Sequence, residues 1–147
     1  MTIQSYYYKG GNIIMPLQTF FNLPDNKRRR IVEAALDEFA TNDYNSASIN
    51  TIINNAEISK GSMYQYFKNK KDLYMYLIEL ASEAKLGTIT KSINNYDEKD
   101  FFKLLKLMHL KGLKFELSHP KYSRLLMNAV GEKNNEKLGN LSSDILK

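Results

Sequence analysis

From residue 25 onward, apolar side chains recur every three or four positions, which is the spacing of one face of an α-helix. The clearest case is the segment that starts at Asp25, where Ile31, Ala35 and Phe39 lie at positions i, i+4 and i+8. The sequence contains no alternating apolar and polar run of useful length, which is the pattern of a half-buried β-strand. The sequence therefore predicts an all-α fold.

Short polar residues mark where the first helices are expected to begin. Four of them precede periodic runs: Asp25, Ser48, Ser59 and Asn69. Their side-chain oxygens can accept hydrogen bonds from the backbone N–H groups that a helix start leaves without an intrahelical partner. After the first helix, Asn42 and Asp43 are residues that tolerate a left-handed backbone conformation. We therefore expect four helices that begin at these caps, the first ending at a left-handed residue.

The second half of the chain contains a strongly apolar helix. Asp97 is its predicted N-cap, and Pro120 is predicted to stop it. Between them lie two apolar stripes, one of Phe101, Leu104, Leu105, Met108 and Phe115 and one of Leu107, Leu110, Leu113 and Leu117. Because two apolar stripes require burial on two sides, the pattern predicts the central helix of a bundle.

The stretch ISKGSMYQYFKNKKDLY, residues 58–74, has an unusual composition for a helix. It combines lysines, a glycine, serines and aromatic residues, with no acidic residue before Asp72. Together with the preceding helix and a turn of three or four residues, it has the dimensions of a helix-turn-helix. In that motif the second helix enters the DNA major groove. The stretch therefore predicts a recognition helix over Ser59–Phe67.

Each unusual residue type in this helix suits contact with DNA. Serine hydroxyls are short donors for phosphates or base edges, lysines neutralise phosphates, and tyrosines pack on sugars while bonding phosphate. A glycine inside a helix costs about 1 kcal/mol relative to alanine, so Gly61 indicates that backbone approaches a partner closely. The alternative is a three-helix module that binds protein, in which Tyr64 and Phe67 are core residues. For Phe67 and Leu73, a core position is the favoured interpretation.

Residues 48–73, SINTIINNAEISKGSMYQYFKNKKDL, resemble the N-terminal DNA-binding domain of the tetracycline-repressor (TetR) family of bacterial transcription regulators. The matching residues are Ser48, Ile52, Ala56, Ile58, Ser59, Gly61, Tyr64, Tyr66, Phe67, Lys70 and Leu73. Residues 27–44 are also similar to the family's first helix. Three positions depart from the pattern: Glu57 and Asp43 stand where glycine is usual, and Ile53 replaces an alanine. A left-handed Glu57 would be strained by about 1 kcal/mol or more, and its carboxylate would oppose DNA phosphate.

The resemblance implies a DNA-binding transcriptional regulator, in particular a ligand-responsive repressor that reads a palindromic operator. Double-stranded DNA and an unidentified small-molecule effector are the implied partners. Ten residues are predicted to contact DNA: Ser48, Asn50, Ser59, Lys60, Gly61, Ser62, Met63, Tyr64, Tyr66 and Lys70. Met108, His109 and Phe115 are predicted to line an effector pocket, with ordinary core positions as the alternative.

The resemblance also divides the chain into three parts. Residues 1–24 are expected to form a flexible N-terminal arm, residues 25–73 the helix-turn-helix DNA-binding domain, and residues 74–147 part of an effector-binding and dimerisation domain. Residues 84–147 supply only some of that second domain's helices, so we expect a truncated domain with an exposed apolar patch. The family implies a homodimer, whereas the length of this chain predicts a weak or non-standard oligomer. Met15 is an alternative natural start to Met1.

Composition bears on other classes of protein. A net charge of +5 with a pI near 9.2 favours an anionic partner. The absence of cysteine excludes disulfides, thiolate metal sites and cysteine nucleophiles, and two histidines are too few to suggest a metal cluster. No catalytic cluster or cofactor motif is apparent, so we expect no enzyme activity, cofactor or metal. No apolar run approaches the roughly 18 residues that span a bilayer, and no secretory signal is apparent, so a cytoplasmic location is expected.

Acidic residues nearly balance the basic ones within residues 25–73. If this region binds DNA, its positive charge must therefore be gathered on one face. The alternative function is a truncated regulator that acts as a protein-interaction module without tight DNA binding. A shift of a DNA duplex at moderate salt would separate the two functions.

Overall fold

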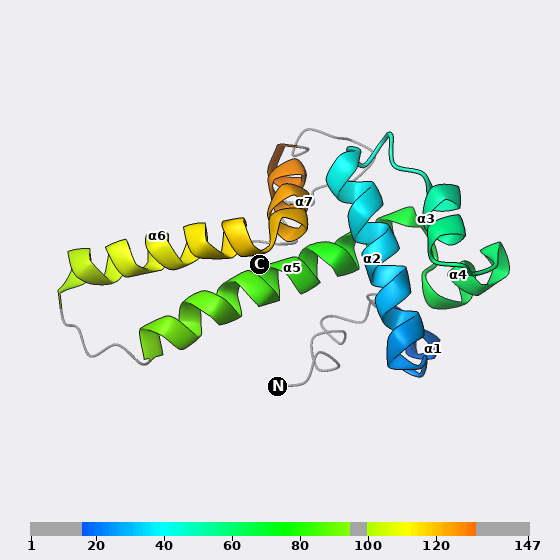
Figure 1. The fold of residues 1–147 in the computed structure, drawn as a ribbon. Helices are drawn as coiled ribbons and strands as arrows, with labels where there is room; N and C mark the ends of the chain where they lie inside the picture. The colour runs from blue at the N-terminus through cyan, green and yellow to red at the C-terminus, as the bar shows by residue number, and fades with distance from the viewer. Residues whose placement is uncertain (1–15, 95–99, 132–147) are drawn as a thin grey trace. The chain divides into compact units, whose positions relative to one another are not determined.

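The computed structural model describes residues 16–94 and 100–131. Within these residues the chain forms seven helices and no strand, so the predicted all-α fold is confirmed (Figure 1). The helices are α1 (Gln18–Phe21), α2 (Asp25–Thr41), α3 (Ile49–Asn55), α4 (Lys60–Tyr66), α5 (Lys70–Asn94), α6 (Phe101–Ser118) and α7 (Pro120–Gly131). The chain divides into two compact units within α5, between Leu77 and Ile78. None of the described helices is long and apolar enough to span a membrane.

The core of the N-terminal unit includes residues of α2, α3 and the start of α5. Ile31 and Phe39 of α2 are fully buried, as are Ile52 of α3 and Leu73 of α5. The ring of Tyr74, also in α5, lies 4.9 Å from that of Phe39, centroid to centroid. These buried residues include the positions that the helical spacing predicts for α2, α3 and α5.

Three of the predicted caps are confirmed. The side-chain oxygens of Ser48 and Ser59 accept the backbone N–H three positions later, at 3.4 Å and 3.1 Å. Asn69 does the same at the start of α5, where its Oδ1 accepts the N–H of Asp72 at 2.9 Å. Local side-chain chemistry therefore sets the starts of α3, α4 and α5.

The predicted Asp25 cap is wrong. Asp25 is the first residue of α2, and no side-chain hydrogen bond caps this helix at the preceding Pro24. The carboxylate of Asp25 instead pairs with the guanidinium of Arg28, one turn later. A carboxylate in the first helical turn still interacts favourably with the helix dipole.

The left-handed end predicted for α2 is also wrong. Asn42 is extended, with φ at −116°, and Asp43 does not have positive φ. The carboxylate of Asp43 accepts the backbone N–H of Ser46 at 2.8 Å, and this hydrogen bonding holds the pKa of Asp43 below its ordinary value. The side chain of Asp43 thus closes this turn without a left-handed residue.

The last part of the predicted N-terminal arm is helical, so that prediction is wrong there. Residues 18–21 form α1, and the ring of Phe20 is fully buried. Its centroid lies 5.0 Å from that of Phe67 and 5.4 Å from that of Tyr76. Burial of an aromatic ring orders this short segment, which has no helical period of its own. Residues 1–15, which include most of the predicted arm and Met15, lie outside the described residues.

In the C-terminal unit, the second half of α5 and α6 lie side by side in opposite directions (Figure 1). Lys85 of α5 and Glu116 of α6 form an ion pair at 2.9 Å. At the junction of α6 and α7, the rings of Phe115, His119 and Tyr122 lie nearly parallel to one another, with centroids 4.5–6.4 Å apart. These contacts fix the α6–α7 turn.

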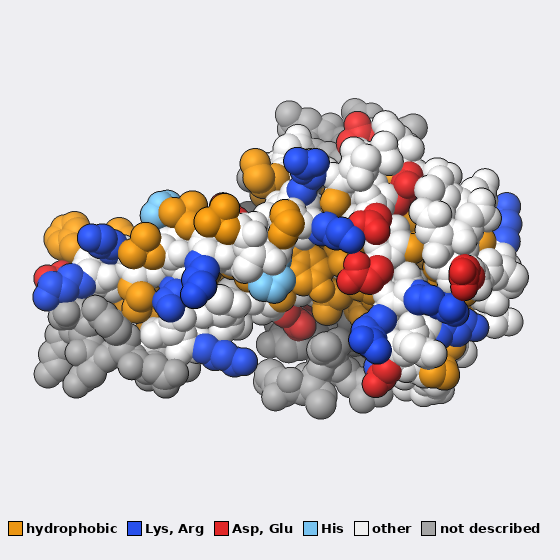
Figure 2. Space-filling model, viewed as in Figure 1, with side chains coloured by type: hydrophobic (Ala, Val, Ile, Leu, Met, Phe, Trp, Pro, Cys, Tyr) orange, Lys and Arg blue, Asp and Glu red, His pale blue; other side chains and the backbone are white. Residues whose placement is uncertain are grey.

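Two expectations for α6 are corrected. Its N-cap is Asp100, whose Oδ1 accepts the N–H groups of Phe102 and Lys103, whereas Asp97 lies outside the described residues. Apolar residues from both predicted stripes are exposed, among them Phe101 at 67% and Leu117 at 86%. Figure 2 shows hydrophobic side chains, in orange, along α6. Burial of α6 on two sides is therefore wrong for the described residues, whereas the predicted exposed apolar patch is present.

Candidate DNA-binding surface

The turn between α3 and α4 sets the direction of α4 relative to α3. The N–H of Ile58 donates to the carbonyl of Ile53 and the N–H of Glu57 to that of Asn54, both at 3.2 Å. This pair of bonds is a Schellman motif, which requires a left-handed residue at the position that Glu57 occupies. Glu57 has φ of 54°, so the predicted left-handed conformation is confirmed.

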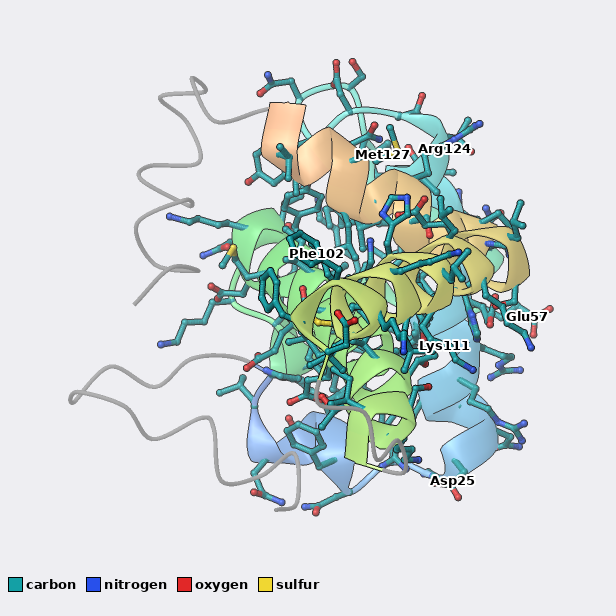
Figure 3. All side chains as sticks on the ribbon, turned by 90° about the vertical axis from the view of Figure 1, so that its left-hand side faces the viewer. Asp25, Glu57, Phe102, Lys111, Arg124 and Met127 are labelled. Atoms are coloured by element: carbon teal, nitrogen blue, oxygen red, sulfur yellow. The ribbon has the colours of Figure 1, made fainter. Side chains whose placement is uncertain are left out.

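Glu57 also carries an ion pair that the sequence pattern did not reveal. Its carboxylate lies 3.1 Å from Nη1 of Arg30 in α2, and both side chains are largely exposed. Figure 3 shows Glu57 at the outer edge of the N-terminal unit. Arg30 therefore offsets the negative charge that was expected to oppose DNA phosphate, although an exposed pair contributes only about 0–1 kcal/mol to stability.

The strain at Glu57 leads to a prediction. Glu57→Gly removes the backbone strain of a left-handed glutamate and also removes the exposed ion pair. We therefore expect the free energy of unfolding to rise by about 0.5–1 kcal/mol. Glu57→Gln is the matched control, because it removes the charge and keeps the strain; it should change stability by less than about 0.5 kcal/mol. Urea denaturation measures both. A glycine variant no more stable than the glutamine variant would show that the backbone strain is negligible.

The helix α4 has one buried face and one exposed face. Lys60, Gly61 and Tyr64 lie on the exposed face, where Tyr64 is 47% exposed, and Ser59 is exposed at the N-cap. The hydroxyl oxygens of Ser59 and Ser62 lie 2.8 Å apart, within hydrogen-bonding distance. The start of α4 thus presents hydroxyls, an ammonium group, bare backbone and a phenol on one surface, all of which can contact phosphates or base edges.

Two of the ten predicted DNA contacts are wrong. Met63 is 1% exposed and Tyr66 is 5% exposed, so both are core residues. They lie three positions apart and share the inward face of α4 with Phe67. The composition of the segment suggested DNA contact for these two residues, but their side chains are buried within the unit and are not accessible to DNA.

Gly61 is not required by the protein's own packing. A Cβ added there would come no closer than 4.0 Å to another side chain, that of Ser59, and Gly61 does not need positive φ. Replacement by alanine should therefore be tolerated by the fold and favoured by helix propensity. Among the described residues, nothing packs so closely on Gly61 that a glycine is needed there.

The predicted contacts at the start of α3 occupy different environments. Asn50 is exposed. Ser48 is half-buried, caps α3, and donates its backbone N–H to Oε1 of Glu38 at 2.8 Å. The amide of Asn42 donates to the same oxygen at 3.2 Å. Glu38, which the sequence did not single out, therefore ties the end of α2 to the start of α3.

Lys70 has structural contacts that its predicted role did not include. Its Nζ donates to the carbonyl of Ala47 at 2.8 Å and lies 4.7 Å from the centre of the Tyr44 ring. A second, longer bond of 3.4 Å reaches the carbonyl of Asn45. Lys70 thus holds the loop before α3 through carbonyl and cation–π contacts. Its contact with DNA stays a prediction.

Positive charge is gathered along α2. Lys27–Arg30 occupy its first half, and Glu33, Asp37 and Glu38 occupy its second half. Figure 2 shows basic side chains over the N-terminal half of α2 and acidic ones over the other. Arg28 is engaged with Asp25 and with the carbonyl of Phe21, whereas Arg29 is exposed. The near balance of charge within residues 25–73 is therefore compatible with a local basic surface.

The three residues predicted to line an effector pocket lie on α6 in the C-terminal unit. Met108 and His109 are exposed, and Phe115 is buried against His119. Neighbouring positions on a helix do not share a face, so Met108 and His109 point in different directions. The effector pocket stays a prediction.

Comparison with known proteins agrees with this geometry. The family of bacterial regulatory proteins, tetR family, matches residues 31–77. A solved TetR family transcriptional regulator from Chloroflexus aurantiacus J-10-FL is 43% identical, with a TM-score of 0.72, over 79% of this chain and 53% of that one. A TetR-like regulator from Rhodococcus sp. RHA1 shares the fold with a TM-score of 0.67 at 21% identity, over 84% of this chain and 66% of that one.

Two curated relatives come from Bacillus subtilis strain 168. The uncharacterized HTH-type transcriptional regulator YuxN is 35% identical over 68 residues, which are 46% of this chain and 22% of that protein. A fatty acid metabolism regulator protein is 34% identical over 53 residues, 36% of this chain and 27% of that protein. The match therefore spans about a quarter of the length of these relatives. Residues 31–77 of this chain thus match the TetR family of bacterial regulatory proteins.

Proposed function

We propose that this chain is a DNA-binding transcriptional regulator that places α4 in the major groove. The observation that carries the proposal is the exposed face of α4, where Ser59, Lys60, Gly61 and Tyr64 lie together in front of a buried face of Met63 and Tyr66. The match of residues 31–77 to a family of bacterial regulatory proteins supports the same function. The bare backbone at Gly61, which the fold does not need, is explained by the close approach of a DNA strand.

The finer proposal is a ligand-responsive repressor on a palindromic operator. One helix-turn-helix makes few base contacts. Specific affinity is therefore expected from two copies whose DNA-binding domains lie one helical turn of DNA or more apart. The single helix α5 begins beside α4 and continues into the C-terminal unit. An effector bound by residues 74–147, with Met108, His109 and Phe115 as proposed contacts, would act on α4 by shifting this helix. A cytoplasmic location is part of the same proposal.

The proposal is tested by selection of duplexes from a random pool, followed by a mobility shift of the selected duplex. We expect the chain to enrich related sequences and to shift the selected duplex at moderate salt. A chain that enriches no sequence and shifts no duplex would favour the alternative of a protein-interaction module.

A variant of Lys60 tests the placement of α4. Lys60→Ala should weaken binding to selected and scrambled duplexes alike and make the slope of log affinity against log salt shallower by about 1, because one phosphate contact is lost. Lys91→Ala is the matched control, since Lys91 is an exposed lysine in the C-terminal unit. Fluorescence anisotropy across a salt series measures both. An equal change of slope in the two variants would show that Lys60 does not make a localised phosphate contact.

A further inference from the structure

The proposed recognition helix is too short to be stable alone. It has seven residues, and isolated helices shorter than about 12 residues are marginal in water. A helix end also leaves its last carbonyls without intrahelical partners. The orientation of α4 therefore depends on what binds its C-terminal end.

The segment that contains α1 supplies two donors to this end. The backbone N–H of Leu17 donates to the carbonyl of Tyr66 at 2.9 Å. The hydroxyl of Thr19 donates to the carbonyl of Gln65, which lies 46 positions later in the chain. Both acceptors are among the last carbonyls of α4, so α1 caps a helix that is remote from it in sequence.

Two further contacts hold α1 in place. The buried ring of Phe20 packs against Phe67, the residue that ends α4. On the other side, Nη1 of Arg28 donates to the carbonyl of Phe21 at 2.9 Å. The segment is therefore attached to α2 and to α4 at once, and it connects the two helices.

We propose that residues 17–21 form a clasp that positions α4 and thereby sets its specificity for DNA sequence. The inference rests on the proposed function. Base edges are read through hydrogen bonds of narrow geometry, whereas phosphate attraction tolerates small displacements. A clasp that fixes the end of α4 therefore supports specific binding more than non-specific binding. Leu17 and Thr19 are positioning residues in this account, since they act through the carbonyls of α4.

Paired substitutions isolate the two donors. Thr19→Val removes the hydroxyl with little change of shape, and Thr19→Ser restores it. Leu17→Pro removes the N–H at a residue whose φ of −66° already suits proline, and Leu17→Ala keeps the N–H while removing the side chain. All four are made in the full chain.

Fluorescence anisotropy compares each variant on a duplex selected by the wild type and on a scrambled duplex. Loss of one hydrogen bond should weaken binding of the selected duplex about five- to tenfold in Thr19→Val and Leu17→Pro, and of the scrambled duplex by less than about twofold. Thr19→Ser and Leu17→Ala should stay within about twofold of wild type on both. Equal losses on the two duplexes, or unchanged binding of the selected one, would overturn the clasp.

Hydrogen exchange of the DNA-free chain gives an independent readout. Amides at the end of α4, including that of Phe67, which donates to Met63 at 2.9 Å, should exchange faster in Thr19→Val than in Thr19→Ser. Unchanged exchange would contradict the clasp whether or not DNA binds. A wild-type chain that enriches no duplex would instead refute the proposed function, while faster exchange in Thr19→Val would still show that α1 holds α4.

Discussion

Phe20→Ala is expected to lower the free energy of unfolding by about 3–5 kcal/mol, which is the usual cost of removing a fully buried aromatic ring. The ring of Phe20 is 5.0 Å from that of Phe67 and 5.4 Å from that of Tyr76, centroid to centroid. Its loss leaves a cavity between α1, the end of α4 and the start of α5. Since domains are stable by only about 5–15 kcal/mol, a large part of the stability of this unit would be lost.

Urea denaturation followed by circular dichroism measures this effect. Phe102→Ala is the matched control, because it removes the same ring from a site that is 78% exposed in α6. We expect that control to change stability by less than about 0.5 kcal/mol. Equal stability of the Phe20→Ala and wild-type chains would mean that residues 16–24 belong to a flexible arm, as the sequence first suggested.

Met63 and Tyr64 are neighbours in α4, and we expect substitution of Met63 to reduce stability and substitution of Tyr64 to reduce DNA affinity. Met63→Ala removes a buried side chain and should cost about 2–5 kcal/mol of stability. Tyr64→Ala alters the exposed face, so stability should change by less than about 0.5 kcal/mol. Loss of an aromatic and hydroxyl contact should nevertheless weaken binding of a selected duplex by about tenfold or more.

Melting temperature and duplex affinity are measured for both variants under the same conditions. Each variant is the control for the other, because the positions are adjacent and differ in which face of α4 they occupy. A Tyr64→Ala chain that unfolds more readily and binds DNA normally would place Tyr64 in the core. That result would support the alternative function as a protein-interaction module.

Local chemistry explains which features the sequence predicted correctly. The caps at Ser48, Ser59 and Asn69 depend on residues within three positions of each other, so a pattern of caps and apolar spacing predicts them. The left-handed Glu57 was indicated by the resemblance, because this residue stands where glycine is usual. The position of the exposed α4 surface was predictable for the same reason.

Features that depend on remote contacts were missed. Helix α1 has only four residues, too few to show a helical repeat of apolar side chains. Its position is fixed by packing of the Phe20 ring against Phe67 and Tyr76. The signal for this in the sequence was the pair of aromatic residues at positions 20 and 21. Lys70 donates to a carbonyl 23 positions earlier, which no local pattern shows. The composition of α4 favoured DNA contact for Met63 and Tyr66, whereas their burial depends on which side of this seven-residue helix packs against the rest of the unit.

The exposed face of α4 is expected to contact DNA. Hydrogen exchange of the chain with and without a selected duplex tests this contact most directly. The amides of Lys60 and Gly61 precede the first hydrogen bond within α4, from Met63 N–H to Ser59 at 3.1 Å, so they should exchange quickly in the DNA-free chain. We predict strong slowing of exchange over residues 59–65 when the duplex is bound, with little change in α7. Protection confined to α6 or α7, with residues 59–65 unchanged, would contradict the account.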